Sequence, residues 1–383
     1  MKDIMHIPRI KNLEEFGILL MIIKTFLDSS VAVPYTDLAD AFLTVTVWSV
    51  FSLTIFSQEY KKDKLVLCVL LLMAAGYSCM KIGNSSLLIT ILTCLAIRRQ
   101  DIDKTINFIF RYTVFLFVLH LLLALASHIL FGSEIWTIYQ GKKVFHLGFG
   151  HRNRLSIIVF NLMILWIYLN FYKIRKRGYF LLTIIGLFTF WLTRTKTFLI
   201  EVIMAVVLLR LINMKKKRIN RAINSLASIL FIVLFLFTNT LVAHYLDGYR
   251  LVSMINTMLT NRIRLGGYAL YNYGITLFGQ KISYIAVWDE LFGLTTFTFD
   301  NIYSFLAINQ GIIWAVIIAI CLWKLAVLRD ARINYCIVLW CLYGLTEVHG
   351  LNCYMFFPLI LIVNLLKNER WKYSKVSVKS NED

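Results

Sequence analysis

Basic side chains stand beside apolar runs at three widely separated places in this sequence. The stretches FGHRNRLSIIV, WLTRTKTFL and LTNRIRLGG each contain a pair of them separated by one residue. These residues are Arg152, Arg154, Arg194, Lys196, Arg262 and Arg264. A guanidinium binds a phosphate or pyrophosphate through paired hydrogen bonds and keeps its charge when it is partly buried. The three stretches could therefore bind one diphosphate group, provided that the fold brings them together.

Two carboxylates follow in the second half of the chain. Asp300 lies in TFDNIYSF, at the start of an apolar run, and Glu347 lies in GLTEVHGLN. A carboxylate beside basic groups could act as a general base and accept a proton from a hydroxyl group. Asp300 could equally cap a helix, and one residue could do both. Glu347, with His349 close by, is the rival acid/base group.

The other polar residues predict neither a metal site nor a cofactor. His146, His151 and His244 lack the spacing of ligands on one helix, and the seven cysteines are scattered through apolar segments as free thiols. Nucleotide-phosphate loops, dinucleotide fingerprints and acidic metal motifs are missing from the sequence. We therefore expect a metal-independent reaction whose donor is not a cytosolic nucleotide sugar.

Composition indicates what must position these groups. The 383 residues are 59% hydrophobic and only 16% charged, which excludes a soluble domain with a polar exterior. The apolar runs are unbroken rather than alternating, so the membrane-spanning elements are expected to be helices and the fold class all-α. The net charge of +19 is explained by cytoplasmic loops of a membrane protein, without a nucleic-acid partner. The chain is thus predicted to be one integral membrane domain, 1–383, embedded in a lipid bilayer.

About twelve transmembrane helices are expected, since a span needs roughly 20 apolar residues and fewer where neighbours shield its ends. They lie near 13–30, 36–57, 64–81, 84–97, 105–131, 153–172, 179–193, 197–212, 222–243, 301–323, 333–346 and 353–366.

The loops determine the expected orientation. Basic loops such as KIRKRG and NMKKKRINR alternate with loops of lower charge, which predicts that both termini are cytoplasmic. The start of the chain lacks a cleavable signal, and 367–383 forms a basic cytoplasmic tail. The large extracytoplasmic loop, 244–300, should carry short helices on the membrane surface. All three basic stretches then lie outside, where topology does not require them. Contacts with lipid headgroups would also account for their position.

Several motifs of the second half resemble the bacterial O-antigen and capsular polysaccharide polymerases of the Wzy type, which are related to the O-antigen ligases. The motifs are NRIRLGGYAL, LFGQ and DNIYSFLAINQG, with WLTRTKTFL as a further match. The positions that match the family are Arg194, Arg262, Phe278, Gly279, Asp300, Asn301, Tyr303 and Gly311. The ligase branch has a histidine where this chain has Asp300, so the resemblance favours a polymerase.

The resemblance implies a GT-C-like glycosyltransferase of exopolysaccharide biosynthesis, with its active site at the outer face of the bacterial cytoplasmic (inner) membrane. It would transfer a growing glycan from undecaprenyl pyrophosphate to an undecaprenyl-pyrophosphate-linked repeat unit. A flippase and a chain-length regulator would be its partner proteins. Asp300, or its rival Glu347, would be the base, supported by Asn301, Tyr303 and His349. Arg152, Arg194, Arg262 and Arg264 would bind the pyrophosphate, with Arg154 and Lys196 as second choices.

Three alternative functions stay open at this point. A lipid-linked oligosaccharide flippase or transporter would also have about twelve helices. An O-antigen ligase would share the motifs, and a structural scaffold of a glycan-assembly complex would need no catalytic group at all. The sequence contains only three prolines and no matching halves, which disfavours a transporter.

Overall fold

The structure is a computed structural model, which describes residues 12–58, 62–97, 101–214, 216–283 and 289–366. These residues form a mostly helical protein with fifteen α-helices. The predicted basic tail, 367–383, lies outside the described residues.

The elements follow one another in a simple order. The α-helices are α1 (Leu13–Leu27), α2 (Asp37–Phe56), α3 (Lys62–Ile82), α4 (Ser86–Ala96), α5 (Ile102–Phe131), α6 (Arg152–Asn170), α7 (Lys176–Thr193), α8 (Lys196–Asn213), α9 (Lys217–Ala243), α10 (Arg250–Met258), α11 (Arg262–Tyr273), α12 (Ile302–Ser304), α13 (Ile312–Val327), α14 (Ala331–Tyr343) and α15 (Val363–Leu366). The other elements are the strands β1 (Trp136–Tyr139) and β2 (Lys142–Phe145), the 3-10 helices η1 (Phe171–Lys173), η3 (His349–Leu351) and η4 (Phe357–Ile362), and the π-helix η2 (Phe305–Gln310).

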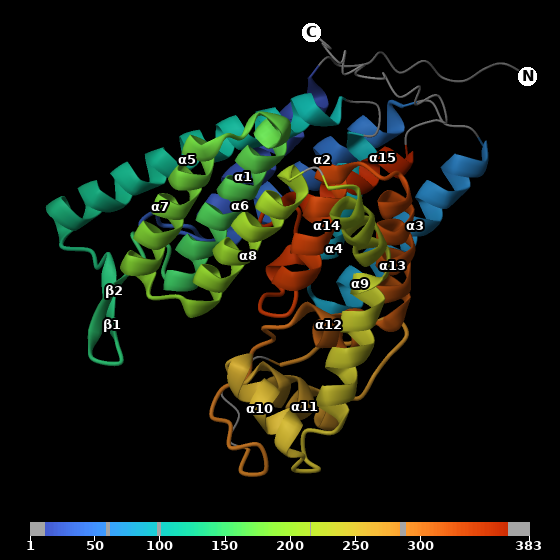
Figure 1. The fold of residues 1–383 in the computed structure, drawn as a ribbon. Helices are drawn as coiled ribbons and strands as arrows, with labels where there is room; N and C mark the ends of the chain where they lie inside the picture. Colours follow the sequence, from blue (N-terminus) through green and yellow to red (C-terminus); the bar gives the residue numbers. More distant parts are fainter. Residues whose placement is uncertain (1–11, 59–61, 98–100, 215, 284–288, 367–383) are drawn as a thin grey trace, which may run out of the picture.

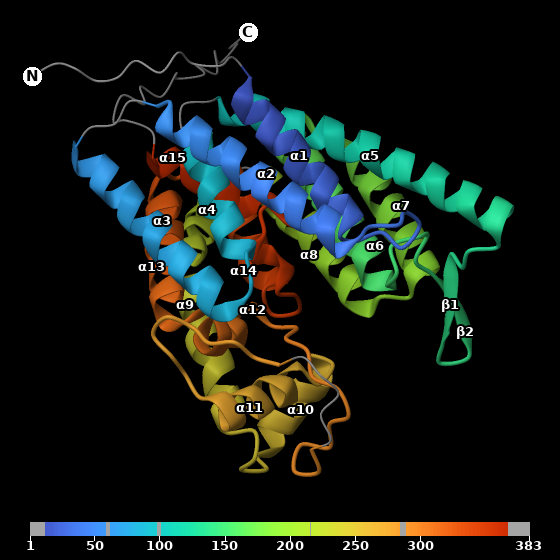
Figure 2. The ribbon, with the colours of Figure 1, turned by 180° about the vertical axis from the view of Figure 1, so that it is seen from behind.

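The long helices lie alongside one another in one bundle, and α6 and α14 lie deep within it (Figures 1 and 2). Helix α9 packs against α13 and α14, and α5 packs against α1 and α6. The start of α1 and helix α15 lie at one end of the bundle. Helices α10 and α11 and the β1–β2 hairpin lie at the opposite end, which we call the loop end (Figure 1).

Five helical segments of the described chain are long and apolar enough to cross a membrane. They are Asp37–Phe56, Leu65–Ile82, Ile102–Phe131, Arg152–Lys173 and Lys217–Ala243. Many of their apolar side chains are exposed; those of Phe115, Leu122 and Ile129 on α5 are 61%, 60% and 71% exposed. In water such a surface would be costly, and lipid is the solvent that suits it. The several candidate spans indicate a multi-pass membrane protein.

Five spans are fewer than the expected twelve because several apolar runs form shorter or broken helices. The run 301–323 is divided into α12, η2 and α13, and the run 353–366 begins with irregular backbone and the 3-10 helix η4. Helix α4 has only 11 residues. Hydropathy alone does not distinguish a continuous helix from an apolar segment that is interrupted and buried among neighbours.

The β1–β2 hairpin was not expected in an all-α chain. Trp136 pairs with Phe145 and Tyr139 with Lys142, and the two turn residues, Gln140 and Gly141, have φ of 49° and 72°. Positive φ at both turn positions is the conformation that matches the right-handed twist of a two-residue hairpin. The hairpin fills the loop between α5 and α6 and ends at the segment that leads into α6.

Two glycines of the polymerase-like motifs meet where the loop 274–283 crosses η2. Gly279 and Gly311 have φ of 81° and 100°. A side chain on Gly311 would collide with the backbone of Leu277 and, at 2.5 Å, with the nitrogen of Gly279. The crossing is held by Gln280 N, which donates to Asn309 O at 2.9 Å, and by Asn309 Nδ2, which donates to Gln280 O at 3.0 Å. These motif residues therefore have a structural role.

Gly311→Ala should destabilise the protein, because the new methyl group meets backbone atoms and the left-handed conformation is strained. We expect a cost of about 1–3 kcal/mol from the backbone conformation alone. Thermal unfolding of the detergent-purified protein measures it. Gly76→Ala, on α3 with no heavy atom within 4 Å of the added carbon, is the control and should leave the unfolding temperature unchanged or raise it. Equal stability of both variants would contradict the described crossing.

Candidate functional site

A buried ion pair joins the loop end to the bundle. Arg262, the first residue of α11, donates from Nη2 to Glu347 Oε1 at 3.4 Å, and the two side chains are 6% and 9% exposed. Arg262 Nη1 also donates to Thr260 Oγ1 at 3.2 Å. Burial raises the pKa of Glu347 well above its ordinary value, and Arg262 opposes this rise by favouring the charged carboxylate.

The turn before α11 sets the direction of Arg262. Thr260 and Asn261 have φ of 53° and 68°, which reverses the chain sharply between α10 and α11. Asn256 of α10 stabilises this turn, since its Nδ2 donates to Asn261 Oδ1 at 3.1 Å and its Oδ1 accepts from Arg264 N at 2.9 Å. One of the free N–H groups at the start of α11 is thereby satisfied from the neighbouring helix.

A second buried carboxylate, Glu201 of α8, lies close to the same pair. Glu201 is 4% exposed and accepts a hydrogen bond from Thr346 Oγ1 at 2.7 Å. Arg262 interacts electrostatically with it. Glu201 was not among the residues expected to form the site, although the sequence contains a signal for it: Glu201 is the only acidic residue of the apolar run 197–212, and such residues are commonly functional.

Asp300 is half-buried and lies within electrostatic range of Arg262 and His151. Burial raises the pKa of Asp300, while Arg262, a 3.5 Å hydrogen bond from Thr298 Oγ1, and His151 lower it. The expectation that Asp300 caps the following helix is wrong. Asn301 is the cap, because its Oδ1 accepts from the backbone nitrogens of Tyr303 and Ser304 at 2.9 and 3.2 Å.

The start of α6 contributes the next charged residues. His151 caps the helix and accepts from Asn153 N at 3.2 Å through Nδ1. Arg152 lies 3.6 Å from the ring centre of Tyr139 on the hairpin, and Arg154 donates to Ser29 Oγ at 3.2 Å. Partial burial and the two adjacent arginines lower the pKa of His151, whereas Asp300 raises it.

His349 is coupled to the same group of charges. Burial, with a smaller contribution from Arg154, lowers the pKa of His349 to about 4, so its imidazole is neutral at physiological pH. The anticipated acid/base partnership of His349 with Glu347 does not appear among the contacts of the described residues, in which Glu347 is paired with Arg262.

The turn between α7 and α8 is attached to the start of α6. Ser156 Oγ donates to Thr193 Oγ1 at 3.1 Å, and Thr195 Oγ1 donates to Asn153 Oδ1 at 3.4 Å. Arg194, in the left-handed conformation with φ of 53°, and Lys196 are exposed in this turn. These hydrogen bonds place the turn against the start of α6, and within the described ranges neither Arg194 nor Lys196 forms an ion pair with the acidic residues of the site.

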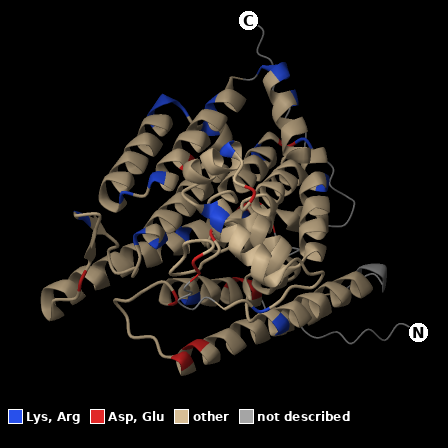
Figure 3. Ribbon diagram, turned by 90° about the horizontal axis from the view of Figure 1, so that it is seen from below, with Lys and Arg blue, Asp and Glu red and all other residues tan. Residues whose placement is uncertain are grey.

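Four arginines have buried donors without a protein acceptor in the described part of the chain; one of them, Arg332 Nε, lies at the start of α14, and the other three belong to the loop end. The three loop-end atoms are Arg152 Nη1, Arg262 Nε and Arg264 Nε. A buried N–H group without a partner is rare and costly, and a bound ion or ligand can supply the acceptor that it lacks. These donors lie at the loop end, where Figure 3 shows basic and acidic segments close together. The arrangement is suited to binding an anion with several acceptor oxygens.

The two remaining predicted residues serve the packing beneath the site. Besides its capping bonds, Asn301 donates from Nδ2 to Leu345 O at 3.1 Å. Tyr303 is completely buried and donates to Cys341 O at 2.6 Å. The two residues attach the start of α12 to the end of α14 and to the turn that follows it, and thereby position Asp300, which directly precedes Asn301.

Comparison of the chain with protein-family models, curated proteins and solved structures returned no match.

Removing Arg262 alone should destabilise the fold strongly, because Glu347 is then left buried without its cation. For Arg262→Met we expect a loss of about 3–5 kcal/mol, and the double change Arg262→Met with Glu347→Gln should be less destabilising than the sum of the single changes. Unfolding of the four proteins in detergent measures this coupling.

The matched control is the pair of Arg332 and Asp103, 3.1 Å apart, in which the Asp103 side chain is 49% exposed. Exposure weakens this pair, so its coupling should stay below about 1 kcal/mol. Equal coupling of the two pairs would contradict the proposed importance of the buried one.

Proposed function

We propose that this protein is a polysaccharide polymerase of the Wzy type, acting at the outer face of the bacterial cytoplasmic membrane. The observation that carries the proposal is the set of unpaired buried donors on Arg152, Arg262 and Arg264, at the end of the bundle that also contains Asp300 and Glu347. A diphosphate supplies the several acceptor oxygens that such donors need. The motif resemblance described above supports the same assignment.

The proposed reaction needs two contributions from the protein. An acceptor hydroxyl oxygen attacks the anomeric carbon of the donor, the bond from that carbon to the diphosphate oxygen breaks, and the hydroxyl proton passes to a carboxylate. The arginines stabilise the negative charge that develops on the departing polyprenyl diphosphate. Asp300 is the better base, because Glu347 is directed at Arg262 whereas Asp300 is only half-buried and accepts a single long hydrogen bond.

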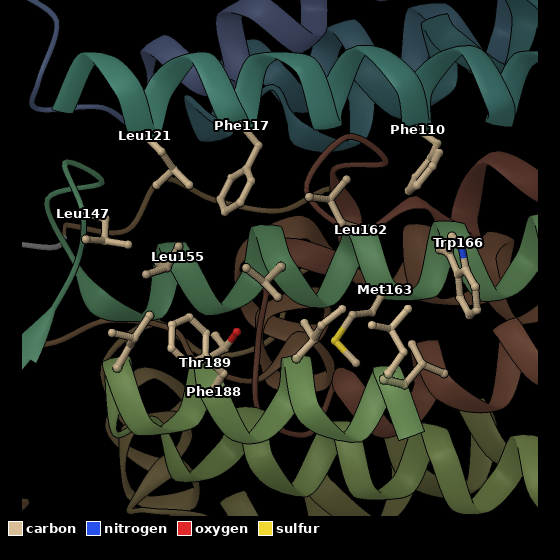
Figure 4. A pocket seen from close by; sticks show the side chains of 15 residues that line it. Phe110, Phe117, Leu121, Leu147, Leu155, Leu162, Met163, Trp166, Phe188 and Thr189 are labelled. Atoms are coloured by element: carbon tan, nitrogen blue, oxygen red, sulfur yellow. The ribbon is translucent and has the colours of Figure 1, made fainter. Parts of the chain in front are cut away.

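An apolar cavity beside the arginines of α6 suits the hydrocarbon chain of such a donor. It has a volume of about 360 Å³ and is lined by apolar side chains of α5, α6 and α7 and by Leu147 of the segment before α6, with Thr189 as the polar exception. Figure 4 shows Phe117 and Leu121 of α5 directed toward α6 across the cavity. Leu155 lines it one residue after Arg154, so a chain in this cavity would have its charged end near the site.

The expected membrane topology and the position of the charged residues support the proposal of a polymerase. Both termini would be cytoplasmic and about twelve segments would cross or enter the bilayer, including short helices shielded by neighbours. A flippase or transporter needs polar groups along a path through the bilayer. The coupled charges described above are instead concentrated at the loop end, which favours chemistry at one face.

Purified protein supplied with undecaprenyl-pyrophosphate-linked repeat units should produce longer glycans. Asp300→Asn and Arg152→Gln should each lower the rate by about 100-fold or more, because they remove the base and a donor to the leaving group. Arg177→Gln is the matched control, since Arg177 is exposed at the start of α7, at the far end of this helix from Arg194.

Gel analysis of the extracted glycans measures chain growth directly. Growth by the wild type that is unaffected by Asp300→Asn would exclude Asp300 as the base. Transfer of intact repeat units across vesicle membranes, without any chain growth, would replace the polymerase proposal with the flippase alternative.

The pH dependence of turnover should report the environment of Asp300. A base must be ionised, so activity is lost as pH falls through its pKa, and the raised pKa of Asp300 moves this loss to higher pH than for an ordinary aspartate. Thr298→Val removes a hydrogen bond that favours the carboxylate and should move the acid limb of the pH–rate profile still higher. Thr296→Val, at another exposed threonine of the same segment, is the control. An unchanged limb in Thr298→Val would show that another group titrates.

A further inference from the structure

A separate pocket lies at the base of the hairpin, beside the charged site. Its volume is about 310 Å³, and it is lined by the end of α5, the turn after α1 and the segments on either side of the hairpin. The lining includes Ser133, Glu134, Thr137 and His146 together with the apolar Val31. Neither the motifs nor the diphosphate assignment accounts for this mixture of polar and apolar groups.

The walls of the pocket are held by backbone contacts. Ile135 O accepts from the backbone nitrogens of His146 and Leu147 at 3.1 and 3.0 Å, and Val31 N donates to Gly148 O at 2.8 Å. Gly148 has φ of 82°, and a side chain there would lie only 2.7 Å from Ala124 Cβ. The walls are therefore fixed by contacts within the protein itself, which reduces the entropic cost of binding a ligand.

His146 is the unusual residue of this pocket. It is only 4% exposed, yet its Nδ1 is buried without a hydrogen-bond partner in the described structure. Burial lowers the pKa of His146, although Glu134 raises it, so the ring is neutral near pH 7 and can donate or accept a hydrogen bond. Glu134 is exposed on the rim of the pocket and adds an acceptor.

The polar and apolar groups that line the pocket fit one class of ligand better than the others. A hydrocarbon would leave the buried imidazole unpaired, and Glu134 repels an anion. A metal site is not indicated, since the described residues contain no group of three or more potential His, Cys, Asp or Glu ligands. A neutral molecule with several hydroxyl groups matches a lining that offers donors, acceptors and a small apolar wall.

Two histidines link the pocket to Asp300, the candidate base, through electrostatic interactions. His146 interacts with His151, and His151 interacts with Asp300. The segment 146–151 that separates the two histidines forms part of the pocket wall and leads directly into the arginine-bearing start of α6. A ligand held here would lie on the same face of the protein as the diphosphate site.

We propose that the pocket between the hairpin base, α5 and the turn after α1 is a sugar-binding subsite, which holds a neutral sugar ring of the acceptor through His146 and Glu134. The identity of the ligand as the acceptor rests on the proposed polymerase function, whereas sugar binding itself does not. His146 donates to or accepts from a ring hydroxyl at the base of the pocket, and Glu134 accepts from a second hydroxyl at the rim.

Saturation-transfer NMR on the full-length protein in detergent tests the subsite without turnover. The probes are glucose, galactose, rhamnose and N-acetylglucosamine, each measured separately. At least one should receive saturation from the wild type, and His146→Ala and Glu134→Gln should each weaken its binding about tenfold through a lost hydrogen bond. His244→Ala is the control, because His244 is exposed and bonded to Asp247 outside the pocket.

The results of these measurements distinguish a failure of the sugar-subsite proposal from a failure of the polymerase proposal. Binding that disappears in Glu134→Gln, an exposed position where folding is not at risk, supports the subsite even if no glycan is polymerised. No transfer to any of the four sugars, or transfer that both pocket variants retain, overturns it. In a turnover assay the pocket variants should raise KM for the acceptor about tenfold and leave kcat nearly unchanged; a fall in kcat alone would also overturn the assignment.

Discussion

The burial of one guanidinium, that of Arg262, constrains the arrangement of the loop end. An unpaired buried charge is too costly to persist, so α11 lies against the bundle where Glu347 meets it, and the buried Glu201 of α8 also interacts electrostatically with Arg262. Three elements distant in sequence are thereby brought together. Because Glu347 is paired with Arg262, we propose Asp300, which is half-buried, as the carboxylate that would accept the proton.

The remaining elements position the charges around that pair. Asn301 and Tyr303 attach α12 to α14, and the crossing of Gly279 with Gly311 attaches the loop 274–283 to η2. Several motif residues that were expected to take part in the reaction thus have a structural role and hold the site in position. The start of α6, which contains Arg152 and Arg154, adjoins an apolar cavity that suits a hydrocarbon chain and follows a segment that lines a polar pocket suited to a sugar. A lipid-linked glycan has both of these parts.

The sequence predicted the positions of helices well where apolar runs are long, as for 105–131, which became α5 (Ile102–Phe131). It did not predict that 301–323 breaks at η2, since apolar periodicity does not report a π-helical turn or a glycine crossing. Nor did it predict that Asn301 caps α12 in place of Asp300, because both residue types are good caps and only the backbone geometry decides between them. The pairing of Arg262 with Glu347 spans 85 positions and depends on tertiary contacts alone.

The most direct measurement is an experimental structure of the protein with undecaprenyl pyrophosphate bound. We expect the diphosphate oxygens to contact the unpaired donors of Arg152 and Arg262, Asp300 to face the first phosphate from the glycan side, and the hydrocarbon chain to enter the cavity between α5 and α7. A diphosphate bound away from these arginines, with Arg262 directed into lipid headgroups and separated from Glu347, would contradict it.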